Sequence, residues 1–491
     1  MVMSFFRASR LGSGLALLML LYALLTPHAS AENPLSSLPP QADHTSEELS
    51  PQAWALIWQQ LREGEALPPQ APYLQTENLR KIFPGDGASA DNFGWSMALS
   101  GDTLVIGAPG DEPSGLDPDA GSVYIFERNQ GGTNRWGQVK KLFASDANTG
   151  ALFGYSLALS ADTLVVGAPK DDAPAVDSGS AYVFERNGGG ENNWGETKKL
   201  VASDGAFDDQ FGRDVAVSNS TIVVGAWLDG DEGTNFGSAY IYERDEGGAA
   251  NWGEATRITP ADASIGDHFG WIVGISLNTI VVSAIGDDDG GNSSGAIYLF
   301  DRSGEDRNSW VEVKKLRASD KAAGDQFGYS VDISSDTIVV GAVGDDDKGI
   351  NAGAVYFFGR HEGGANAWGQ IIKRTAFDGA ADNVFGGSVA LSRDTVIVGS
   401  PASESSAGQV NSGAAYLFER NLGGLNNWGQ MDKLTAPDEF SDDTFGYSVM
   451  VDIDTVVIGA HNNDDRGTDS GSAYVAELTR LWSYYLPCAR Q

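Results

Sequence analysis

The sequence predicts an all-β protein that folds as a seven-bladed β-propeller of four-stranded antiparallel blades. The first observation is a repeat, because the pair Phe-Gly recurs every 58 or 60 residues, at Phe93, Phe153, Phe211, Phe269, Phe327, Phe385 and Phe445. A fixed period of this length indicates one supersecondary unit copied along the chain. The second observation is that each unit holds four short β-rich runs separated by turn residues, with no helical periodicity between them. Four antiparallel strands in each of seven units are typical of a propeller.

The second unit shows the four runs in order. Residues 153–160 form the first run, and residues 163–168, Thr-Leu-Val-Val-Gly-Ala, form the second. The second run is apolar at both alternating positions, as in a strand buried on both faces. The third run, 179–186, alternates around Tyr182 and Phe184, and the fourth, 194–204, mixes lysines with apolar residues as an edge strand does.

The strand count also predicts how the ring closes. The fourth run follows the third in six units, beginning at Trp136, Trp194, Trp252, Trp310, Trp368 and Trp428. A seventh copy, Leu79-Arg-Lys-Ile-Phe83, precedes the first Phe-Gly pair. We expect this displaced strand to complete the last blade; the tail 481–491 is a competing candidate that matches the pattern less well.

Segments outside the repeats complete the domain organisation. Residues 1–31 are predicted to be a secretory signal peptide, with Arg7 and Arg10 before an apolar run and Ala29-Ser-Ala31 as the cleavage pattern. Residues 32–78 form a Pro-rich linker in which Trp54, Ile57 and neighbouring apolar residues predict one helix. The propeller spans residues 79–480, and 481–491 form a C-terminal tail. We therefore expect an exported protein, periplasmic or extracellular, with no transmembrane anchor.

The composition limits the partners. The formal net charge is −35, and such a surface repels nucleic-acid phosphates and anionic lipids while it favours cations or basic partners. No nucleic-acid partner is therefore expected. The alternative interpretation is that the acidic residues only keep an exported protein soluble.

The repeats resemble the FG-GAP repeats of integrin α-subunit propellers, and more closely those of bacterial FG-GAP repeat proteins. Each Phe-Gly pair is followed by a motif such as Gly107-Ala-Pro109, Gly167-Ala-Pro169 or Gly225-Ala-Trp227, and the resemblance covers residues 79 to 478. It implies adhesion or binding at a cell surface. Integrin-type repeats place an acidic calcium loop between the Phe-Gly strand and the next strand, but here that position holds tight turns such as Ser100-Gly-Asp-Thr103. A turn this short cannot supply the 6–8 oxygens that calcium prefers.

Acidic residues are predicted to gather on one face of the ring. In a four-stranded meander, the loop between strands two and three lies at the same edge as the connection to the next blade, and both are rich in Asp. Calcium is the possible cofactor there, with candidate ligands Asp287, Asp288, Asp289, Asn292, Asp345, Asp346, Asp347 and Asn351. The alternative is that these side chains only serve turn geometry.

The same face carries the candidate partner-binding residues, which are Asp171, Asp172, Asp229, Asp231, Trp227, His461, Asp464 and Asp465. Trp227 and His461 break the repeat by replacing Pro at the end of strand two. Trp271, which follows a Phe-Gly pair and is matched by Trp95, breaks it too. In contrast, the Trp that begins each fourth strand recurs so strictly that we expect it to pack between blades.

These observations predict an exported, non-catalytic binding or adhesion module. It would dock a protein or glycan partner on the acidic loop face, in a cation-dependent manner if the loops hold calcium. The sequence contains no His-Glu-x-x-His cluster, Gly-x-Ser-x-Gly elbow or phosphate-binding Gly-x-x-x-x-Gly-Lys motif. A hydrolase or lyase acting on polysaccharides, and a structural envelope protein, are the alternatives.

Overall fold

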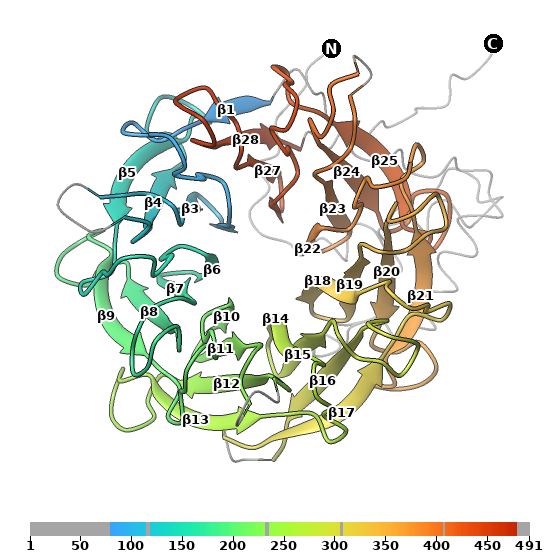
Figure 1. Ribbon diagram of the computed structural model, residues 1–491, viewed down its shortest axis with the longest axis horizontal. Helices are drawn as coiled ribbons and strands as arrows, with labels where there is room; N and C mark the ends of the chain where they lie inside the picture. The colour runs from blue at the N-terminus through green and yellow to red at the C-terminus, as the bar shows by residue number, and fades with distance from the viewer. Residues whose placement is uncertain (1–78, 114–117, 231–234, 305–307, 406–407, 479–491) are drawn as a thin grey trace, which may run out of the picture. The chain divides into compact units, whose positions relative to one another are not determined.

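The computed structural model describes residues 79–113, 118–230, 235–304, 308–405 and 408–478. These residues form seven four-stranded antiparallel sheets arranged as blades around a central axis (Figure 1). The predicted all-β propeller is therefore confirmed. The signal peptide 1–31, the linker helix within 32–78 and the tail 481–491 lie outside the described residues. No helix among the described residues is long and apolar enough to cross a membrane.

The strands follow one another from the axis to the rim in each blade. The first blade contains β2 (Met97–Ser100), β3 (Thr103–Ala108), β4 (Ser122–Glu127) and β5 (Gly137–Leu142). The second contains β6 (Ser156–Ser160), β7 (Thr163–Ala168), β8 (Ser180–Glu185) and β9 (Gly195–Leu200). The third contains β10 (Asp214–Ser218), β11 (Thr221–Ala226), β12 (Ser238–Glu243) and β13 (Gly253–Ile258).

The remaining blades repeat this order. The fourth contains β14 (Phe269–Ser276), β15 (Thr279–Ala284), β16 (Ala296–Arg302) and β17 (Trp310–Leu316). The fifth contains β18 (Phe327–Ser334), β19 (Thr337–Ala342), β20 (Ala354–Gly359) and β21 (Gly369–Arg374). The sixth contains β22 (Ser388–Ser392), β23 (Thr395–Ser400), β24 (Ala414–Glu419) and β25 (Gly429–Leu434), and the seventh contains β26 (Val449–Asp452), β27 (Thr455–Ala460) and β28 (Ser472–Glu477).

The outermost strand of the seventh blade comes from the other end of the ring. It is β1 (Arg80–Ile82), which pairs antiparallel with β28 and places Lys81 opposite Tyr474. Figure 1 shows β1 beside β28, where the chain's first and last described strands meet. The predicted closure by residues 79–83 is confirmed.

The core lies between the blades rather than within any one of them. All six residues of β3, and of each equivalent second strand, are buried. One core cluster, for example, combines Val105 and Ile125 of the first blade with Val166 of the second. The same cluster contains Phe153 of the Phe-Gly pair and Trp194 at the start of a fourth strand. The expectation that the repeated Trp packs between blades is therefore confirmed.

The glycine of each Phe-Gly pair is required by close backbone contact. Gly154 has φ +93°, and a Cβ added to it would lie 2.7 Å from the carbonyl oxygen of Ser122 in the preceding blade. The glycine of the Gly-Ala-Pro motif faces it, because a Cβ on Gly107 would lie 2.1 Å from the Gly154 oxygen. No other residue combines this conformation with this approach.

Arginines at the ends of the third strands link neighbouring blades, at the edge of the ring where the turns between first and second strands lie. Arg186 pairs with Asp162 in its own blade and with Glu127 of the preceding blade, both at 2.7 Å, and its guanidinium lies 4.6 Å from the Trp194 ring centre. The same stacking of Arg on Trp recurs in five other blades. These contacts explain why the Arg and the Trp repeat together.

We expect removal of β1 to destabilise the ring. A chain that begins at Gly85 leaves the edge of β28 unpaired and removes the Lys81 contacts with Asp438 and Asp465. Its melting temperature should fall by several degrees relative to a chain that begins at Leu79, and the exposed edge should promote self-association. Scanning fluorimetry and light scattering measure both effects. Equal melting temperatures would contradict closure by β1.

Candidate functional site

The loops between second and third strands contact the connections that lead into the next blade. Gly150 in such a connection donates its N–H to the Pro118 carbonyl at 2.9 Å, and Leu152 donates to the Asp119 carbonyl at 3.2 Å. The two acidic sets therefore share one side of the ring, as the sequence predicts. We call this side, made of these loops and connections, the acidic face.

A lysine lies at the centre of each acidic cluster in the fourth and fifth blades. The Lys315 ammonium contacts carboxylate oxygens of Asp262, Asp287 and Asp289 at 2.8, 2.6 and 2.7 Å. Lys373 contacts Asp320, Asp345 and Asp347 at 2.9, 2.6 and 2.7 Å in the same way. The Tyr298 hydroxyl lies 2.9 and 3.0 Å from carboxylate oxygens of Asp262 and Asp287 and donates its one hydrogen to either of them.

Related clusters occur in the other five blades. Their ion pairs join Lys141 to Asp86 and Asp111, Lys199 to Asp146 and Asp171, Arg257 to Asp204 and Asp229, Lys433 to Asp378, and Lys81 to Asp438 and Asp465. The cation always comes from the outermost strand. Sequence reasoning treated that strand only as an exposed edge and missed these pairs, although its basic residue recurs in every blade.

Each lysine partly compensates the negative charge of its cluster. Burial alone lowers the pKa of Lys315, but hydrogen bonds from its ammonium to the three carboxylates outweigh this and raise that pKa. Burial by itself raises the pKa of Asp262, but the hydrogen bonds from Lys315 and Tyr298, together with the positive charge of Lys315, outweigh it and lower that pKa. Lys315 and Asp262 therefore both stay charged at neutral pH, and the one ammonium offsets only part of the charge of the three carboxylates that it contacts.

The residues predicted to hold calcium do not fit the ion in this arrangement. Carboxylates of Asp320, Asp345 and Asp347 converge as metal ligands would, but the Lys373 ammonium contacts all three. Calcium needs 6–8 oxygens at 2.3–2.6 Å, and a cation already occupies their centre. The calcium site itself stays a prediction.

The other predicted ligands serve the loop backbone. Asp288 accepts the N–H of Ser293 at 2.7 Å, and Asp346 accepts that of Asn351 at 2.8 Å. The Asn351 amide donates to Asp382 at 3.1 Å, and the backbone carbonyl of Asn292 accepts from Gly324 at 2.9 Å. These contacts support the alternative interpretation, in which the side chains set the geometry of the turns.

Most predicted partner-binding acids are also engaged within their own blades. Asp171 is buried against Tyr182 and Lys199, and Asp229 against Tyr240 and Arg257. Asp172 and Asp464 accept loop N–H groups, and Asp465 pairs with Lys81. Asp231 lies outside the described residues. The acidic loops are therefore less available to a partner than their composition suggests.

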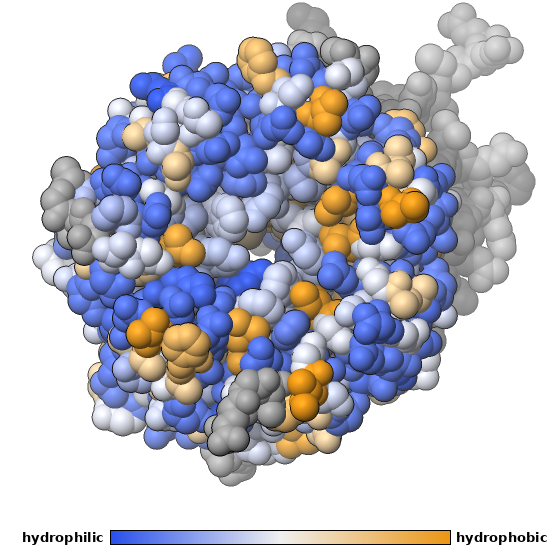
Figure 2. Space-filling model, viewed as in Figure 1, coloured by the Kyte–Doolittle hydropathy of each residue, from blue (hydrophilic) through white to orange (hydrophobic). Residues whose placement is uncertain are grey.

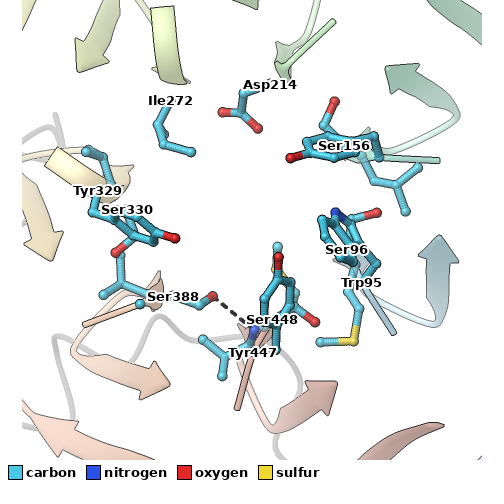
Figure 3. Close-up of a pocket in the computed structure, with 18 of the residues that line it drawn as sticks. Trp95, Ser96, Ser156, Asp214, Ile272, Tyr329, Ser330, Ser388, Tyr447 and Ser448 are labelled. Carbon is cyan, nitrogen blue, oxygen red and sulfur yellow. Dashed lines mark hydrogen bonds between the residues drawn. The ribbon is translucent and has the colours of Figure 1, made fainter. Parts of the chain in front are cut away.

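The centre of the same face has a different character. The residue after each Phe-Gly pair lies at or just before the start of an innermost strand, on the acidic face, and we call this set the central collar. It consists of Trp95, Tyr155, Arg213, Trp271, Tyr329, Gly387 and Tyr447, which line a cavity of about 250 Å³. Figure 2 shows a hollow at the centre of the ring, and Figure 3 shows collar side chains around it.

Ring contacts connect most of the collar. The Trp95 ring centre lies 5.3 Å from that of Tyr155 and 4.9 Å from that of Tyr447. The Arg213 guanidinium lies 3.9 Å from the Trp271 ring centre and 5.1 Å from that of Tyr155. Gly387 contributes no ring to the collar, and a Cβ added to it would lie 3.3 Å from the Val384 oxygen and 3.4 Å from Pro401.

The predicted repeat-breaking residues support the collar from outside. The His461 ring centre lies 5.0 Å from that of Trp95, and the Trp227 ring centre lies 5.0 Å from that of Trp271. Burial lowers the pKa of His461 to about 4, so its ring is neutral at neutral pH. The structure thus places all four repeat-breaking residues at the channel mouth. Trp95 and His461 form one pair there, and Trp271 and Trp227 form the other.

Two carboxylates near the axis were missed by sequence reasoning. Asp214 accepts the Val273 N–H of the next blade at 2.8 Å, and its carboxylate points into the channel (Figure 3). Burial raises the pKa of Asp214 to about 7. Asp332 accepts the Leu391 N–H at 2.7 Å, and burial raises its pKa to about 6. The available signal was that Asp214 stands where five other blades have Ser.

Comparison with known families supports the repeat assignment. A family model described as FG-GAP repeat matches residues 77–126, 136–184, 194–242, 252–300, 310–358, 368–418 and 428–476. Together these segments cover more than half of the chain. A comparison with curated proteins gave no match.

The lysine-centred cluster predicts the effect of removing its cation. Lys373→Met leaves Asp320, Asp345 and Asp347 without the ammonium. The free energy of unfolding should fall by about 2–4 kcal/mol at pH 7 because uncompensated carboxylates remain partly buried. Millimolar calcium should restore part of this loss in the variant and leave the native protein unchanged.

Chemical denaturation with and without calcium measures these effects. Lys348→Met, which changes an exposed lysine on the same face, is the matched control. If calcium stabilised the native protein as much as the variant, metal binding would occur despite the lysine.

Asp214 predicts a pH dependence of stability. Its folded-state pKa of about 7 lies above the unfolded value of about 3.9, so the folded state binds the proton more tightly. Stability from this group is therefore lost as pH rises from about 4 to about 7. Asp214→Asn keeps an acceptor for Val273 and should stabilise the protein at pH 8, by on the order of 1 kcal/mol, with little effect at pH 4.5. Chemical denaturation at both pH values measures this effect, with Asp346→Asn at an exposed position as the control. Destabilisation by Asp214→Asn at pH 8 would contradict the raised pKa.

Proposed function

The chain belongs to the FG-GAP repeat family, and on that premise we propose that it is an exported, non-catalytic binding or adhesion module. It docks a protein or glycan partner on the acidic face of its propeller. The fold is compatible with this role, because a ring of equivalent blades presents an extended loop surface without requiring a catalytic constellation.

The observation that carries the proposal is the central collar. A repeat architecture needs the same packing residues in each blade, and the Phe, Tyr and Trp of the core follow that rule. The collar does not, because its seven positions carry five aromatic residues, one Arg and one Gly. Trp95, Trp271 and Arg213 are only partly buried. A concave, largely aromatic lining with a few polar groups is typical of a ligand site.

The ion pairs within the acidic loops make the collar a better contact point for a partner than the loops themselves. Their carboxylates already hold lysine or arginine, so a basic partner would have to displace an internal cation. We therefore place the docking centre at the channel mouth, with the acidic loops as its surroundings. Cation dependence, which the acidic loops suggested, is not needed for this mode of binding.

The glycosidase alternative has less support. Such enzymes use two carboxyl groups on either side of the scissile bond, and Asp214 is the one carboxylate among the residues that line the cavity. Asp332 lies on β18 of the fifth blade, two blades from Asp214, and is not among the residues that line the cavity. Binding without turnover is therefore the function that the geometry favours.

The test is a binding screen with glycans and envelope proteins, with product analysis on each glycan that is retained. We expect retention without product, and at least about a tenfold loss of affinity for Trp95→Ala because an aromatic contact is removed. Phe440→Ala, at a 60% exposed aromatic residue outside the collar, is the control. Released product would favour the enzyme, and no retained ligand would favour a structural envelope role.

A further inference from the structure

We propose that the central collar binds a single acidic sugar ring, a uronate unit of a polysaccharide, with its carboxylate on Arg213 and its ring against the aromatic side chains. This inference rests on the proposed function and specifies its ligand. It follows from three features of the collar: a guanidinium that among the described residues forms no ion pair and has only a longer-range electrostatic interaction with Asp214, convergent hydroxyl groups, and aromatic surfaces in a small cavity.

Arg213 differs from the arginines that link blades. Those at the opposite edge, such as Arg128, Arg186 and Arg302, pair with carboxylates. Arg213 stacks on Trp271 at 3.9 Å, and within the described part of the chain it forms no ion pair. An arginine held flat on an indole keeps its N–H edge free for two parallel hydrogen bonds to a carboxylate. The geometry points to an anionic group of the ligand at this position.

Tyrosine hydroxyls surround the same space. Tyr329 and Tyr447 reach the channel from blades five and seven and point toward its middle (Figure 3). Burial raises the pKa of both hydroxyls, and Arg213 lies close enough to oppose that shift. Across the described residues, neither hydroxyl has a protein partner within hydrogen-bond distance. Phenolic groups both donate and accept, which suits the hydroxyl groups of a sugar.

The aromatic surfaces and the cavity size restrict the rest of the ligand. Trp95, between Tyr155 and Tyr447, offers an apolar surface beside these polar groups. A volume of about 250 Å³ accommodates one sugar ring rather than an extended chain laid flat. Gly387 is the one collar position without a side chain, and in this proposal the adjoining sugar units leave the cavity past it.

Other ligand classes use only part of this arrangement. An acidic peptide side chain would pair with Arg213 but leave the aromatic surfaces without a partner. A neutral sugar would stack on the rings but leave the guanidinium desolvated and unpaired, which costs free energy. Because the protein carries a net charge of −35, an anionic ligand is repelled at long range. Its affinity should therefore be maintained or increase with added salt, whereas a cationic partner would bind more weakly.

The first experiment compares ligands on the intact chain by calorimetry. The probes are tetrasaccharides of galacturonate, glucuronate and mannuronate, the corresponding neutral tetrasaccharides and a tetraglutamate peptide. We expect at least one uronate to bind tenfold or more tightly than its neutral counterpart and the peptide. Tighter binding of a neutral sugar or of the peptide would overturn the uronate assignment and leave the binding module intact. Failure of every uronate would also overturn the assignment, whereas failure of the wider ligand screen would overturn both.

Two variants test the collar itself. Arg213→Gln should lower uronate affinity tenfold or more and change the affinity for neutral sugars little, while Arg393→Gln, at an exposed turn of the opposite face, should bind as the native protein does. Gly387→Tyr deletes no contact and installs the residue that three other blades carry at this position. The added ring should occupy the space through which the adjoining sugar units leave and so abolish binding. Native affinity in both collar variants, with unchanged melting temperatures, would overturn the proposal.

Discussion

The backbone contact between the Phe-Gly pair of one blade and the Gly-Ala motif of the blade before it determines the spacing of the ring. The Gly154 oxygen accepts a hydrogen bond from Ser96 of the preceding blade at 2.6 Å, and the Gly154 N–H donates to Gly167 of its own blade at 3.1 Å. The same residue therefore joins two sheets at a distance that only glycine permits. With the blades this close, the second strands are buried on both faces, and the Phe rings fill the space between sheets. The residues after the Phe-Gly pairs then surround a narrow axis, where the collar forms.

A second constraint concerns charge. A protein with a net charge of −35 that gathers carboxylates on one face must limit their mutual repulsion. Here each blade supplies its own cation from the outermost strand, so the compensation is covalently attached. A tethered ammonium does not depend on the concentration of a free ion, and it holds the loop and the connection together in the way a bound metal would. The Asp-rich loops predicted calcium on this face, whereas in the structure lysine and arginine side chains make these contacts.

Features that depend on repeat spacing could be predicted from the sequence, whereas features that depend on strand register could not. The Phe-Gly period predicted the blades, their order and the shared acidic face, because these depend on spacing and strand number alone. The displaced strand at Leu79–Phe83 predicted the closure for the same reason. The lysine clusters were missed because they depend on register: a bulge between Ile125 and Phe126 places Lys141 opposite Tyr124, and only then does the ammonium reach Asp86 and Asp111. Alternation along the strand does not reveal a bulge.

The collar also shows why an asymmetric site can arise in a symmetric ring. A substitution within a blade interface changes packing with one neighbour, so most positions there are constrained to repeat. A collar residue instead lies outside the core clusters between blades, and it contacts collar residues of neighbouring blades beside the channel. Arg213 and Gly387 replace aromatic residues at this level, and the flanking Phe and Gly contacts remain as in other blades. One cation, Arg213, and one position without a side chain, Gly387, therefore make the channel mouth asymmetric, although the repeat itself is symmetric. A binding site can be built there with very few departures from the repeat, without weakening the contacts that hold the ring together.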